Sequence, residues 1–141
     1  MKKLKVELGM IGLFLVIWVG FSLTLPPKLV ASSEDEKFNA IYTVSHSLKE
    51  TWAGELTWDE LDGEIVDLSF YENDTQLTGD FLSEPIDMRQ NSYYEFVFLG
   101  SEPNSDSDYT LRILWKASGE SHEEVLTFKE KKRFFVLPTL D

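Results

Sequence analysis

Strict alternation of apolar and polar residues is the feature that most constrains the fold of this chain. In residues 65–71, Val66, Leu68 and Phe70 alternate with Asp67, Ser69 and Tyr71. Residues 109–116 repeat the pattern, with one face made of Tyr109, Leu111, Ile113 and Trp115. Successive side chains of a β-strand point to opposite faces, so both segments are typical of strands that are covered on one face.

Turn signals separate further segments of the same kind. The expected strands are residues 39–52, 55–58, 65–71, 76–82, 93–99, 109–116, 123–128 and 134–137. Residues 93–99 are apolar on both faces, which predicts a central strand. Short strands at regular spacing, without a convincing soluble helix, predict an all-β fold. We expect an antiparallel β-sandwich, either a jelly-roll or an immunoglobulin or fibronectin III-like domain.

The same alternation predicts the core of this sandwich. We expect four side chains to be buried together between two sheets, namely those of Phe96, Phe98, Leu111 and Ile113. Arg112 lies on the opposite face of its strand from Ile113. Truncating Ile113 to alanine is therefore expected to destabilise the domain by about 2–5 kcal/mol, and truncating Arg112 by well under half of that loss unless Arg112 is paired.

An uncharged stretch from Leu8 to Leu25 precedes the predicted strands. As a helix it would be roughly 27 Å long, close to the thickness of the hydrocarbon core of a bilayer. Lysines at positions 2, 3 and 5 precede it, and the positive-inside rule then predicts a cytoplasmic N-terminus and an outer C-terminal domain. We expect a cytoplasmic basic segment at 1–7, a transmembrane or signal-anchor helix at 8–25, a polar spacer at 26–38 and a β-sandwich at 39–141.

The alternative is that the apolar stretch is a signal peptide and that the domain is secreted. Small residues follow Pro26-Pro27, so a signal peptidase would cut near Ala31 or Ser32. Because the chain has no cysteine, it cannot be a lipoprotein and has no disulfide. On either alternative we expect a chain starting near Ser33 to fold alone as a soluble β-rich domain.

The charge of the C-terminal part excludes one class of partner. Thirteen basic residues less the three N-terminal lysines, and 25 acidic residues less Glu7, leave a net charge of −14 from Pro26 onward. A surface as acidic as this repels the phosphate backbones of nucleic acids. We therefore expect no nucleic-acid partner. The two histidines, His46 and His122, lie in no motif with a nucleophile or a metal-ligand spacing, and we expect no enzyme.

Two sets of residues are candidates for a ligand site. Trp52 and Trp58 flank the turn Ala53-Gly54 and could present an aromatic platform to a sugar ring, although core packing is the favoured alternative. Oxygen-bearing side chains alternate at Asn104, Asp106 and Asp108, which is the spacing of the first half of a calcium loop. A complete calcium loop would have a turn glycine at position 109 and a bidentate glutamate at position 115, but this chain has Tyr109 and Trp115 there. A solvated hairpin loop is therefore favoured over calcium, and no other cofactor is expected.

One basic cluster stands out in the acidic domain, at Lys129 to Arg133. It could contact an anionic glycan, a lipid headgroup or an acidic partner. Lysines also keep the edge strands of sheets soluble, and we favour that role for this cluster.

Three segments between Thr78 and Gly119 carry a resemblance to a known family. These segments are Ser83-Glu84-Pro85-Ile86, the aromatic strand Tyr93 to Leu99, and the strand and turn Leu111 to Gly119. Together they resemble the galactose-binding-like jelly-roll modules of extracellular proteins. The resemblance implies binding of carbohydrate or another cell-surface ligand, often with a structural calcium, and it transfers no site residues. We therefore expect a membrane-anchored binding module, or alternatively a structural accessory subunit of a larger membrane or cell-envelope complex.

Overall fold

The computed structural model describes residues 2–24, 26–45, 51–59, 61–79 and 82–132. The chain divides into two compact units, residues 28–131 and residues 1–27 with 132–141. In the second unit the described element is the helix α1 (Lys2–Thr24).

The helix α1 includes nearly all of residues 8–25, the segment that was expected to cross a membrane. Within the described parts of the chain, no helix combines the length and the apolar character that crossing a membrane requires. The expected transmembrane span is therefore not supported.

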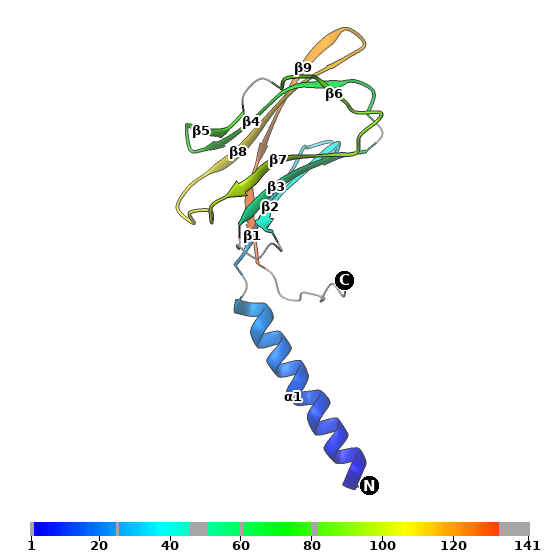
Figure 1. Cartoon of the computed structure of the whole chain (residues 1–141), viewed down its shortest axis with the longest axis vertical. Coiled ribbons are helices and arrows are strands. Elements are labelled where there is room, and N and C mark those ends of the chain that lie inside the picture. The colour runs from blue at the N-terminus through cyan, green and yellow to red at the C-terminus, as the bar shows by residue number, and fades with distance from the viewer. Residues whose placement is uncertain (1, 25, 46–50, 60, 80–81, 133–141) are drawn as a thin grey trace. The chain divides into compact units, whose positions relative to one another are not determined.

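The unit 28–131 is built from two antiparallel sheets (Figure 1). The first has the order β10-β1-β2-β3-β7, and its strands are β1 (Lys28–Ser32), β2 (Phe38–Val44), β3 (Trp52–Trp58), β7 (Tyr93–Gly100) and β10 (Lys129–Lys131). The second has the order β5-β4-β8-β9, with β6 paired to β4, and its strands are β4 (Glu64–Glu72), β5 (Thr75–Thr78), β6 (Ile86–Asp87), β8 (Tyr109–Ala117) and β9 (Glu120–Thr127). The predicted all-β fold with antiparallel packed sheets is confirmed.

The chain passes directly from one sheet to the other after β9. Thr127 ends β9 in the second sheet, and Lys129 begins β10 in the first. The buried residue between them, Phe128, donates its backbone N–H to the carbonyl of Tyr109, 2.9 Å away. This crossover joins the sheets on one side of the sandwich, whereas β5 and β7 are the edge strands on the other side.

The core lies between the sheets and is rich in aromatic rings. Phe70 is at its centre, and its ring contacts those of Tyr42, Phe96, Tyr109 and Phe128. Leu111 and Ile113 are fully buried, as the alternation predicted, and Phe96 is also buried. Phe98 is not part of the core, because 66% of its surface is exposed. The prediction for Phe98 was therefore wrong.

A β-bulge explains the position of Phe98. The pairing of β3 with β7 shifts register on both sides of Gly54, so that the adjacent residues Phe96 and Val97 are both buried. A bulge inserts an extra residue and re-aims the side chains that follow it. Residues 93–99 were expected to form a central strand, yet β7 is at the edge of its sheet and its outward apolar residues meet solvent.

The strand β1 occupies part of the segment that was expected to be a polar spacer. It pairs with β2 on one side and with β10 on the other. Leu29 and Ala31 alternate with less buried neighbours and enter the core. A cut near Ala31 or Ser32, the expected cleavage site, would thus fall inside a strand. The expected strand 134–137, His46 and Arg133 lie outside the described residues.

The strand β8 allows its register to be tested by two neighbouring substitutions. Ile113→Ala should destabilise the fold by about 2–5 kcal/mol, because it leaves a cavity between the sheets. Arg112→Ala should cost less than half as much, since its ion pair with Glu123, at 2.6 Å, is largely solvent-exposed. Chemical denaturation of the two variants measures both losses. A larger loss for Arg112→Ala would contradict the register of β8.

Candidate functional site

The two tryptophans proposed as a sugar platform are core residues. Trp52 and Trp58 are each 3% exposed. The Trp52 ring packs against Tyr42 with its centroid 5.4 Å away, and the Trp58 indole N–H donates to the carbonyl of Met88 at 3.0 Å. Both rings belong to the buried core, so the platform hypothesis was wrong and the favoured alternative, core packing, is confirmed.

The loop proposed for calcium is held together by hydrogen bonds of its own. The Asn104 side-chain oxygen accepts from the N–H of Asp106 at 3.1 Å, and the backbone N–H of Asp108 donates to the side-chain oxygen of Asn73 at 3.0 Å. In return the N–H of Asn73 donates to the carbonyl of Asp108 at 2.7 Å. Among the described residues, no three acidic or histidine side chains come together as metal ligands. The site at Asn104, Asp106 and Asp108 thus has the hydrogen bonding of an ordered hairpin loop.

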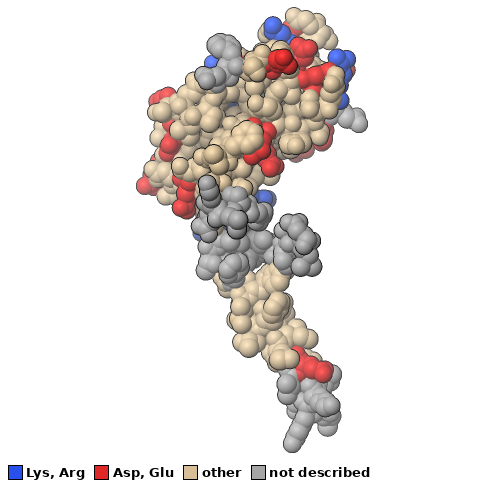
Figure 2. Space-filling view, viewed as in Figure 1, with Lys and Arg blue, Asp and Glu red and all other residues tan. Residues whose placement is uncertain are grey.

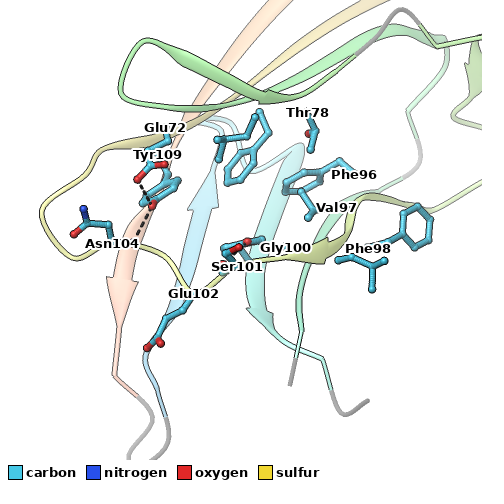
Figure 3. A pocket seen from close by; sticks show the side chains of 14 residues that line it. Glu72, Thr78, Phe96, Val97, Phe98, Gly100, Ser101, Glu102, Asn104 and Tyr109 are labelled. Carbon is cyan, nitrogen blue, oxygen red and sulfur yellow. Dashed lines mark hydrogen bonds between the residues drawn. The ribbon is translucent and has the colours of Figure 1, made fainter. Parts of the chain in front are cut away.

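A groove of about 470 Å³ opens between the edge strands β5 and β7 (Figure 3). Its inner part is aromatic, and the rings there belong to Tyr42, Phe70, Phe96 and Tyr109. Its outer part is formed by the ends of the edge strands and the segment after β7, with Leu77, Thr78, Phe98, Leu99, Ser101 and Glu102. Among the described residues, the lining contains two glutamates, Glu72 and Glu102, and no lysine or arginine.

Tyr42 fixes the end of β7 at the base of this groove. Its hydroxyl donates to the carbonyl of Ser101, 2.7 Å away. Gly100 makes this approach possible, because a Cβ there would lie only 2.1 Å from the Tyr42 hydroxyl oxygen. Burial raises the pKa of Tyr42 to about 12, so the hydroxyl keeps its proton and donates throughout the physiological pH range. The groove therefore has a fixed wall on the β7 side.

A second tyrosine fixes one carboxylate of the groove (Figure 3). The Tyr109 hydroxyl donates to Glu72 Oε1 at 2.8 Å and accepts from the backbone N–H of Asn104 at 2.8 Å. Burial raises the pKa of Tyr109, which keeps the hydroxyl protonated and able to donate. The apolar inner part and these fixed polar groups are suited to non-covalent binding of a ligand with an apolar portion.

Exposed apolar residues distinguish β7 from the other edge of its sheet. Phe98 is 66% exposed and Leu99 is 80% exposed, and Tyr93 is also exposed at the beginning of the strand. The opposite edge strand, β10, consists of the exposed charged residues Lys129, Glu130 and Lys131. This arrangement agrees with the role favoured for the basic cluster, since charges on an edge strand oppose unwanted strand pairing. The β7 edge has no such protection on its exposed apolar positions.

One part of this site has a signal in the sequence, namely residues 93–99. Residues 93–99 are apolar on both faces, and that pattern arises either in a central strand or in an edge strand that is covered by a partner. The segment after β7, with Ser101 and Glu102, is polar and gave no signal, because only the fold brings it next to Tyr42. His122 lies against the ring of Trp115, with centroids 4.5 Å apart, and is not part of the groove.

Comparisons with family models, with curated proteins and with solved structures find no match for this chain. The resemblance to galactose-binding-like modules between Thr78 and Gly119 therefore stays a prediction. The function of the groove and of the β7 edge therefore has to follow from the residues that form them.

Proposed function

We propose that the β-sandwich is a protein-interaction module that docks on its partner through β7 and the adjoining groove. The observation that carries this proposal is the exposure of Phe98 and Leu99 on an edge strand. Proteins normally protect free edges with charge, as this chain does at β10. An apolar edge beside a groove is typical of a surface that a partner covers.

This function corresponds to the accessory-subunit alternative, and it replaces carbohydrate as the leading hypothesis. A sugar-binding module presents the faces of exposed aromatic rings near loops, and both candidate tryptophans are buried. A docking subunit has an apolar patch on a strand, and β7 carries one. The proposal is a non-catalytic role, and it applies equally to a jelly-roll and to an immunoglobulin-like sandwich.

The proposed location of the module is outside the cytoplasm. Its support is the N-terminal sequence, in which Lys2, Lys3 and Lys5 precede the uncharged stretch from Leu8 to Leu25. Basic residues before an apolar segment are typical of exported proteins. The partner would accordingly be a protein of the cell envelope.

Site-specific photo-crosslinking in the native cells tests the docking surface. A photoreactive phenylalanine analogue at Leu99 should give a discrete protein adduct, whereas the same analogue at Val125, an exposed apolar residue of β9, should not. The further substitution Phe98→Glu should reduce the Leu99 adduct at least fivefold, because it places a charge in the apolar contact. Equal adducts at positions 99 and 125, or an adduct that Phe98→Glu leaves unchanged, would contradict the proposal.

A further inference from the structure

We infer that β7 takes an extended peptide as an additional strand, and that this peptide alternates apolar and basic side chains. The inference rests on the proposed function and specifies the chemistry of the partner. It follows from three features of the β7 edge: a backbone side with no partner strand among the described residues, the groove on its inner side and the acidic residues on its outer side.

The backbone of β7 offers the first of these features. On one side it pairs antiparallel with β3, and it ends the strand order of its sheet in the described part of the chain. The N–H and C=O groups of its other side are therefore open to a further strand, which would bind through main-chain hydrogen bonds. The Tyr42 hydroxyl, bound to the carbonyl of Ser101, holds the end of this edge in place and reduces the ordering cost of binding.

The groove determines why every second side chain of the peptide should be apolar. Side chains of an added strand alternate between the two faces of the sheet. Those on the inner face would project over the groove between β7 and β5, above the rings of Phe70 and Phe96 (Figure 3). Apolar side chains at alternate positions would fill this space and exclude water from the aromatic inner part.

The outer face of the sheet at β7 determines why the alternate side chains of the peptide should be basic. Glu95 of β7 is the direct cross-strand partner of Glu55 in β3. Like charges directly opposite each other in a sheet are destabilising, and neither glutamate forms an ion pair within the described residues. A lysine or arginine on an added strand would lie next to Glu95 and offset this repulsion. Its aliphatic stem would also cover the exposed Phe98.

Charge also argues against a second copy of this chain as the occupant. Acidic side chains predominate over basic ones on the face of the domain shown in Figure 2. Pairing two β7 edges would bring further glutamates beside Glu95 instead of a cation. A basic peptide is complementary to this surface, and another acidic domain is not.

Three blocked seven-residue peptides test the inference on the full chain. The first alternates valine and lysine, the second alternates valine and glutamate, and the third repeats the first with alternate backbone nitrogens methylated. Fluorescence anisotropy of the labelled peptides should show the valine-lysine peptide binding at least tenfold more tightly than either of the others. Backbone amide NMR shifts on titration should concentrate in β7.

Two charge reversals separate local recognition from general attraction. Glu95→Lys should weaken binding of the valine-lysine peptide about fivefold or more. Glu120→Lys makes the same charge change at an exposed residue of β9 and should alter binding less than twofold. Equal losses in the two variants would show that attraction to the whole acidic surface is responsible, and would overturn the inference.

The remaining outcomes distinguish the inference from the proposed function. Equal binding of the methylated peptide would exclude strand addition, and equal binding of the valine-glutamate peptide would exclude recognition of basic residues. Failure of all three peptides to bind, with the Leu99 photo-adduct intact, would overturn the inference and leave the docking surface standing. A dimer in sedimentation analysis that Glu95→Lys strengthens and Phe98→Glu disrupts would assign the β7 edge to a second copy instead.

Discussion

Replacing Phe70 with alanine should destabilise the sandwich by about 3–5 kcal/mol, the range for truncating a large buried aromatic residue. Phe70 is 1% exposed, and its ring centroid lies between 5.2 and 5.8 Å from those of four other rings, in Tyr42, Phe96, Tyr109 and Phe128. These rings come from both sheets and from the crossover after β9. The loss therefore includes contacts that hold the two sheets together, and chemical denaturation of the full chain measures it.

Phe98→Ala is the matched control, because it removes the same side chain from the exposed part of β7. We expect it to cost less than about 1 kcal/mol, since surface substitutions of this kind disturb no packing. A loss comparable to that of Phe70→Ala would show that Phe98 is packed in the free protein. It would also remove the observation on which the proposed docking surface depends.

Removal of β1 should have a still larger effect, because this strand lies between two others. A chain shortened to begin at Lys28 keeps β1, whereas a chain that begins at Ser33 loses the buried side chains of Leu29 and Ala31 and the pairing with β2 and β10. We expect the second chain to lose more than about 4 kcal/mol, much of the net stability of a typical domain. Circular dichroism with thermal melting should show a cooperative transition for the first chain only.

This expectation corrects the one drawn from the sequence, which placed the beginning of the folded domain near Ser33. Identical melting of the two chains would show that β1 is dispensable. If β1 is required, a peptidase that cuts near Ala31 or Ser32 would release an unstable domain. Any processing that preserves the fold must then act before Lys28.

The parts of the fold that could be predicted are those in which local alternation and long-range packing agree. Leu111 and Ile113 are an example, because β8 has a neighbour on each side and a regular ladder with β9. Phe98 is the opposite case. The bulge lies opposite Gly54, where the lack of a side chain leaves room for the Phe96 ring, and no local pattern in residues 93–99 reveals this contact with another strand.

The candidate site could be predicted less well than the core, for a related physical reason. The polar groups that fix the groove are paired across long stretches of sequence, such as Tyr42 with Ser101 and Glu72 with Tyr109. Tryptophans and alternating oxygen-bearing side chains are conspicuous in a sequence, yet here Trp52 and Trp58 fill the core, and Asn104, Asp106 and Asp108 belong to an ordered loop. Residue type alone does not show which aromatic side chain remains exposed after folding.

The crossover at Phe128 has a mechanical consequence for the groove. Thr127 ends β9 and Lys129 begins β10, so the single residue Phe128, bound to the carbonyl of Tyr109, connects the two sheets on that side. At the opposite margin the sheets are connected by the longer segment 101–108 between β7 and β8, and the groove lies there between β5 and β7. If a ligand widens the groove, we expect the change at this margin and not at Phe128, with the ring contacts of Phe70 opposing it.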